Sequence, residues 1–118
     1  MKVYINREYV SGPWGGGNKT VKLLKDKCIE NNFSVVHTLK DEDIDVIFCI
    51  DPRPNNKGEW YQDIINYKNK KPDTKIIQRV GDVGTHSKPE LTQLIKQSTN
   101  YSDFIIFPSD WARKYIQY

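Results

Sequence analysis

A glycine-rich segment with one large aromatic side chain is the part of the sequence whose residue types most directly favour ligand binding. It reads Ser11-Gly12-Pro13-Trp14-Gly15-Gly16-Gly17-Asn18 and separates an apolar strand-like run from a segment with helical periodicity. Consecutive glycines permit positive φ angles and leave no Cβ to hinder a close approach. A turn of this kind before a helix N-terminus presents N–H groups to an anion. Candidate ligand-binding residues are therefore Trp14, Gly15, Gly16, Gly17 and Asn18. The alternative is a plain flexible connection without a ligand.

Two side chains able to transfer protons follow a later strand, in Gly81-Asp82-Val83-Gly84-Thr85-His86. Asp82 and His86 are candidate catalytic residues, because an imidazole titrates near neutral pH and a carboxylate acts as a base or orients a hydroxyl. The alternatives are a solvent-facing His86 just ahead of a helix and an Asp82 that caps a turn.

Asp51 and Arg53 follow the third apolar run, in Asp51-Pro52-Arg53-Pro54, where they are placed to bind a polar ligand. Alternatively, they pair with each other or with solvent. His37 has no identifiable partner and is interpreted as structural. The Asp-x-Asp spacing of Asp41 and Asp43 suits a divalent cation, but it lies in a turn before a strand, so we expect no metal site.

Known phosphate-binding patterns are missing from the glycine-rich segment. It lacks the GxGxxG order of dinucleotide sites, no acidic residue ends the second strand to hold a ribose, and no GKS or GKT follows. We therefore expect no dinucleotide cofactor and no Walker P-loop.

Strand and helix patterns alternate along the whole chain and position these residues. Apolar runs predict strands at 3–5, 33–36, 44–50, 75–80 and 103–107. Helical periodicity predicts a first helix from Asn18, as N-cap, to Asn31-Asn32, and a second from Glu59 to Lys70 with Trp60 and Ile64 on one face. A third helix is predicted to start at the capping-box pair Ser87 and Glu90, with Pro89 in its first turn and a buried face from Leu91 to Ser98. A last short helix follows the cap residue Ser109. The run 44–50, apart from Asp45, is apolar on both faces, and 103–107 is again continuously apolar. These patterns predict an α/β fold: a Rossmann-like open parallel sheet of about five strands with helices on both faces, an α/β/α sandwich.

Ligands of such sheets bind beyond the carboxyl ends of the strands. The loops at these ends are Arg7–Gly17, Asp51–Gly58, Gly81–His86 and Pro108–Asp110. The unusual residues of the sequence are concentrated in these same four loops. We therefore expect one edge of the sheet to be the working face.

Composition restricts the function classes. The 118 residues suit one domain, 1–118. The net charge of +3, from 18 basic and 15 acidic residues, is too weak and too evenly spread to indicate nucleic-acid binding. Cys28 and Cys49 are predicted to be buried thiols without a disulfide, which favours a reducing, cytoplasmic setting. No signal peptide and no membrane-spanning run are expected.

Four segments in order resemble the N-terminal half of a two-domain, GT-B fold glycosyltransferase of the retaining family 4. They are Pro13-Trp14-Gly15-Gly16-Gly17-Asn18, Ile50-Asp51-Pro52-Arg53, Gln78-Arg79-Val80-Gly81-Asp82 and the run from Ser102 to Trp111. Each motif is short, but their common order spans nearly the whole chain. Arg79 and Ser109 lie within these segments and join the candidate substrate-binding residues.

The resemblance implies that this domain binds mainly the acceptor, a sugar, lipid or protein. A C-terminal domain would then bind most of the nucleotide-sugar donor, with catalysis in the cleft between them and no obligatory metal. The glycine-rich loop would lie near the donor phosphates, and Asp82 or His86 near the reacting sugar. The glutamate-rich donor motif of the second domain has no counterpart here, so either the chain is a fragment or a partner chain supplies it.

On either account we expect the isolated chain to be inactive. An exposed apolar surface near Trp111 and Tyr115 would mark the contact with a second domain. The alternative is a stand-alone Rossmann-like module that binds a phosphorylated ligand or a protein partner without catalysis, because this fold hosts many functions.

Overall fold

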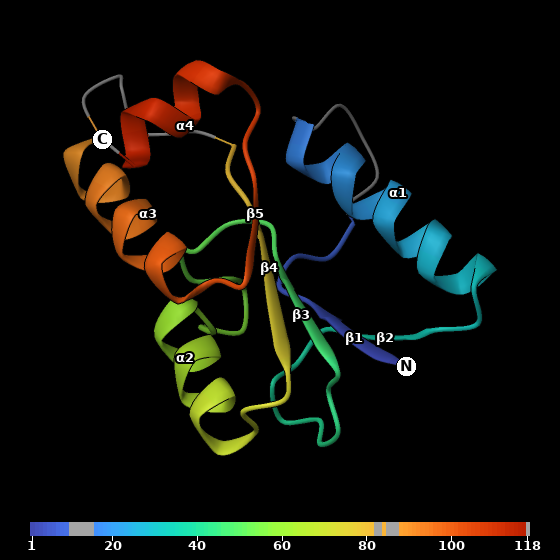
Figure 1. The fold of residues 1–118 in the computed structure, drawn as a ribbon. Coiled ribbons are helices and arrows are strands. Elements are labelled where there is room, and N and C mark those ends of the chain that lie inside the picture. Colours follow the sequence, from blue (N-terminus) through green and yellow to red (C-terminus); the bar gives the residue numbers. More distant parts are fainter. Residues whose placement is uncertain (10–15, 82–83, 85–87, 118) are drawn as a thin grey trace.

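Strands and helices follow one another along the chain, except between the second and third strands. The computed structural model describes residues 1–9, 16–81, 84 and 88–117 (Figure 1). The elements are β1 (Lys2–Ile5), α1 (Gly16–Glu30), β2 (Ser34–Val36), β3 (Val46–Cys49), α2 (Tyr61–Lys70), β4 (Lys75–Arg79), α3 (Pro89–Tyr101), β5 (Phe104–Ile106) and α4 (Asp110–Gln117).

The five strands form one parallel sheet in the order β2-β1-β3-β4-β5. From β1 the chain winds in one direction to β2, and from β3 it winds in the other direction to β4 and β5. This is the doubly wound arrangement, whose reversal point lies between β1 and β3. The predicted Rossmann-like α/β fold is confirmed.

Helices cover both faces of the sheet because alternate strand residues point to opposite sides. On one face Val21 and Cys28 of α1 pack against Val3 and Ile5 of β1. On the other face α2 contributes to a separate cluster of buried residues: Tyr4, Ile44, Ile47, Cys49, Tyr61, Ile64 and Ile76. Both cysteines are buried free thiols, as predicted.

The fourth helix extends the core on the α3 side. Ala112 and Ile116 of α4 pack with Val80, Leu91 and Ile95, at the end of β4 and along α3. The helix begins where predicted, because the Ala112 N–H donates to Ser109 Oγ at 3.0 Å. Ser109 is therefore confirmed as its cap.

The apolar run 103–107 gives the expected strand, but β5 is an edge strand that is covered on one side only. Phe104 and Ile106 are more than half exposed, whereas Ile105 packs against the α3–α4 cluster. The register aligns Phe104 with Ile77 and Phe48, which places it on the α1 side of the sheet. Because the α1 cluster includes residues of β1, β2 and β3 but none of β4 or β5, this part of the face remains open.

Two local predictions were wrong. The first helix begins at Gly16, so Asn18 lies inside its first turn and is not its N-cap. Trp60 precedes α2 instead of joining its buried face, where Ile64 lies as predicted. The Trp60 N–H donates to Asp63 Oδ2 at 2.9 Å, a capping contact at the start of the helix, and the Trp60 side chain is exposed. Among the described helices, none has the length and apolarity of a membrane span.

Two glycines with positive φ provide a matched test of backbone constraints. Gly58 (φ +76°) lies in open space, whereas a Cβ on Gly84 (φ +80°) would lie 2.5 Å from the Lys88 carbonyl oxygen and 2.4 Å from Thr92 Oγ1. We expect Gly58→Ala to lower the free energy of unfolding by about 1 kcal/mol through backbone strain alone. Gly84→Ala should cost about 1–3 kcal/mol more, because the start of α3 must move. Urea denaturation measures both, and equal losses would contradict this account.

Candidate functional site

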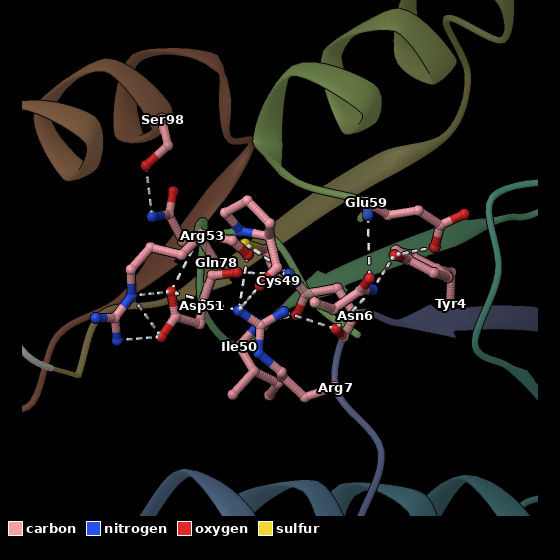
Figure 2. A network of polar contacts seen from close by, with 12 residues as sticks. Tyr4, Asn6, Arg7, Cys49, Ile50, Asp51, Arg53, Glu59, Gln78 and Ser98 are labelled. Carbon is pink, nitrogen blue, oxygen red and sulfur yellow. Dashed lines mark hydrogen bonds and ion pairs between the residues drawn. The ribbon is translucent and has the colours of Figure 1, made fainter. Parts of the chain in front are cut away.

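The edge of the sheet at the reversal point is organised around Asn6, which directly follows β1. Its side chain is almost fully buried. Asn6 Oδ1 accepts the Ile50 N–H at 2.7 Å, and Nδ2 donates to the Asp51 carbonyl oxygen at 2.6 Å (Figure 2). One amide thereby satisfies two backbone groups beyond the regular ladder and holds the end of β3 against the end of β1.

This contact places a carboxylate between two arginines. Asp51 receives a bidentate interaction from Arg53, with Nε 3.0 Å from Oδ1 and Nη2 2.7 Å from Oδ2. Arg7 Nη2 lies 3.7 Å from Asp51 Oδ1, and the same nitrogen donates to the Arg53 carbonyl oxygen at 2.7 Å. Of the two alternatives for Asp51 and Arg53, the structure shows that they pair with each other.

The local charges keep Asp51 ionised. Burial by itself raises the pKa of this carboxyl, but hydrogen bonds from the Arg53 side chain and N–H and the positive charges of Arg53 and Arg7 outweigh it. The net result is a pKa below the usual range. At neutral pH Asp51 is therefore a carboxylate that orients Arg53.

A small cavity connects this pair with Arg79 of β4. Its walls include Asp51, Arg53, Arg79 and Gly81, and its volume is about 40 Å³, which admits a water molecule or a single oxygen of a larger group. The Arg79 guanidinium lies against the backbone of Gly81, where a Cβ would come within 2.8 Å of Nη1. Within residues 1–9, 16–81, 84 and 88–117, the Arg79 guanidinium has no hydrogen-bond or ion-pair partner.

We call Asn6, Arg7, Asp51, Arg53 and Arg79 the switch-point cluster. Its three guanidinium groups and one carboxylate give the cluster a net charge of +2. The α1 N-terminus lies at the same edge of the sheet and has no acidic residue in its first turn (Figure 1). The helix dipole therefore adds to the positive potential. The chemistry that this edge favours is the binding of an anion.

Two other side chains near this edge, a thiol and an imidazole, belong to types that can act in catalysis, but both have structural roles here. Burial, followed by the Asp51 charge, raises the pKa of the Cys49 thiol to about 12, so Cys49 is not a thiolate nucleophile at neutral pH. His37 Nδ1 lies 2.9 Å from the Ile5 carbonyl oxygen and ties the end of β2 to that of β1. Among the described residues, no group of three or more His, Cys, Asp or Glu side chains is placed to hold a metal ion.

The predicted site residues fall into three groups. The structure brings Asp51, Arg53 and Arg79 together. It places Gly16, Gly17 and Asn18 in the first turn of α1, and Ser109 at the cap of α4. The calls on Trp14, Gly15, Asp82 and His86 fall outside the described residues. Sequence reasoning missed Asn6 and Arg7, although both directly follow an apolar strand, as Asp51 does.

The Asp51 interactions predict a pH-dependent contribution to stability. Because its pKa is lower in the folded than in the unfolded chain, the contribution is present above the unfolded value of about 4 and is lost as the pH falls through the folded value. We expect Asp51→Asn to lower the free energy of unfolding by about 1–3 kcal/mol at pH 7. The difference from the wild type should shrink toward pH 3 in urea denaturation.

The exposed pair formed by Lys22 and Asp26 on α1 supplies the control for this measurement. Asp26→Asn should change stability by less than about 0.5 kcal/mol at pH 7. A loss in Asp51→Asn that stays constant between pH 7 and pH 3 would contradict the assigned role of the carboxylate.

Comparison of the chain with protein-family models, with curated proteins and with solved structures finds no match.

Proposed function

We propose that the chain binds the phosphate groups of a sugar compound at the switch-point cluster, as the acceptor-side, N-terminal domain of a GT-B glycosyltransferase. The observation that carries the proposal is the Arg79 guanidinium, which has no partner in the described part of the chain and shares a cavity with Asp51 and Arg53. A planar guanidinium matches the oxygen spacing of a phosphate and binds it through two parallel hydrogen bonds.

The positions of the glycosyltransferase-like segments support the sugar-transfer part of the proposal. These segments follow or span the ends of β1, β3, β4 and β5, which are consecutive neighbours in the sheet. The described parts of these segments, far apart in the sequence, therefore border one edge of the sheet. In the proposed enzyme this edge is one wall of the cleft, and Asp82 or His86 act near the reacting sugar.

The exposed surface of α4 supports a contact with a second domain. Trp111 and Tyr115, 61% and 39% exposed, stack on each other with ring centroids 5.3 Å apart. Exposed apolar patches on a protein surface often mark the contact with another domain, and this stacked pair is a candidate for such a patch. In the proposal that domain, or a partner chain, binds most of the nucleotide-sugar donor.

The anion site is tested by Arg79→Gln. Binding of pyrophosphate and of UDP-glucose to the 118-residue chain is followed by titration calorimetry and by the intrinsic fluorescence of its three tryptophans. We expect the variant to bind at least about tenfold more weakly, because a charge-assisted hydrogen bond is lost. Its urea denaturation should match that of the wild type, since Arg79 has no folded-state partner in the described residues.

Lys27→Gln is the charge-matched control, because Lys27 lies near the far end of α1 and is largely exposed. It removes the same positive charge and should leave binding unchanged. Equal affinities of Arg79→Gln and wild type for both ligands, or no binding of either ligand to the wild type, would overturn the anion site.

The enzymatic part has a separate test. The isolated chain, incubated with nucleotide-sugar donors and sugar acceptors, should transfer no sugar, because the proposed donor domain is missing from it. Transfer by the chain alone would contradict the proposal. A downstream reading frame encoding a second βα-repeating domain with paired glutamates would support the enzyme. A stop codon after Tyr118 would favour the alternative of a stand-alone module that binds phosphorylated ligands.

A further inference from the structure

A second hollow lies between α2 and α3 and shares no residue with the cavity of the switch-point cluster. Its volume of about 300 Å³ is at the lower end of the range for small-molecule sites. The lining comes from the start of α2 and the second half of α3: Trp60, Tyr61, Gln62, Ile65, Leu94, Gln97 and Tyr101. We call it the α2–α3 groove.

The groove is lined by uncharged residues alone, although 28% of the chain is charged. Trp60 and Tyr101 are 38% and 59% exposed, while Ile65 and Leu94 are half-buried. A charged ligand would lose hydration here without gaining an opposite charge. The lining therefore favours a neutral ligand.

The groove is held open by contacts at its base. Tyr61 is buried, and its hydroxyl lies 2.8 Å from Ser102 Oγ, which joins the start of α2 to the end of α3. Trp60 and Tyr101 do not stack on each other. In the described part of the chain the stacked ring pair is Trp111 with Tyr115. In the described part of the chain, the exposed rings of Trp60 and Tyr101 are therefore not occupied by stacking on another ring.

Two glutamine amides add polar groups to these aromatic walls. The side-chain amide of Gln97 has no hydrogen-bond partner among the described residues, so its two N–H donors and its carbonyl oxygen can all bind a ligand. Gln62 donates one N–H to Asn66 Oδ1 at 3.1 Å and retains a second N–H and a carbonyl oxygen. A purely apolar ligand would bury these amides without partners, at a cost of about 1–3 kcal/mol each.

We infer that the α2–α3 groove binds a neutral oligosaccharide. A pyranose ring has an apolar C–H face, which stacks on aromatic rings, and a rim of hydroxyls, which exchange hydrogen bonds with amides. The groove presents both kinds of partner and no competing charge. The inference is independent of the proposed function, because it involves neither phosphate nor the switch-point cluster.

The test uses maltohexaose and cellohexaose as probes of the full 118-residue chain. Binding is measured by titration calorimetry and mapped by backbone NMR shifts, which we expect to concentrate on the first half of α2 and the second half of α3. Trp60→Ala and Gln97→Ala should each weaken the binding of the recognised oligosaccharide at least fivefold. Gln97 is exposed, so its replacement leaves the fold intact even if Trp60→Ala disturbs the start of α2.

Gln93→Ala is the matched control, one turn earlier on the same helix, exposed and outside the groove. Its affinity should equal that of the wild type. The inference is overturned if neither oligosaccharide binds the wild-type chain, or if Gln97→Ala binds as tightly as Gln93→Ala.

Discussion

The hydrogen bonds of the buried Asn6 amide determine the structure of the sheet edge at which the strands end. Beyond β1 the chain leaves toward α1 on one face, and beyond β3 it leaves toward α2 on the other, so the ladder between these strands must end here. Asn6 satisfies the Ile50 N–H and the Asp51 carbonyl oxygen at the point of separation. Because an unpaired buried backbone group costs about 1–3 kcal/mol, the amide fixes the backbone of Asp51, and the carboxylate then orients two arginines.

The winding of the chain makes the two faces of the sheet unequal. The α1 crossover joins β1 to β2 and covers only that half and β3, whereas α2, α3 and α4 share the opposite face. The face covered by three helices contains a buried set of hydrogen bonds. Gln78 Nε2 donates to Ser98 Oγ at 2.7 Å, and Ser102 Oγ donates to Gln78 Oε1 at 2.8 Å. On the other face β5 leaves apolar side chains exposed. The exposed apolar surface of β5 and the buried hydrogen bonds of Gln78 thus both follow from the same strand order.

The sequence predicted the fold well because apolar runs and helical periodicity report burial directly. It placed Asp51, Arg53 and Arg79 at one edge, since parallel strands end on the same side. It failed where tertiary context decides. The apolar character of Phe104 does not reveal an edge strand, and the helical periodicity around Trp60 does not reveal that this residue precedes the helix and is exposed. Asn6 was missed because a single polar residue after a strand has no periodic signature, and only the neighbouring strand shows its role.

The arginines of the switch-point cluster differ in what ligand binding costs them. Arg53 is already held by Asp51 in a bidentate pair, so a phosphate must share or displace a carboxylate that the contacts with Arg53 and Arg7 keep ionised at neutral pH. The pair orders the Arg53 side chain in advance but offsets part of the attraction. Arg79 has no such partner in the described chain and loses only solvent contacts and side-chain freedom, about 2 kcal/mol or less. Its attraction for an anion is therefore not opposed by an existing ion pair. In the proposed anion site, Asp51 and Arg53 would therefore set the geometry, and Arg79 would supply most of the affinity.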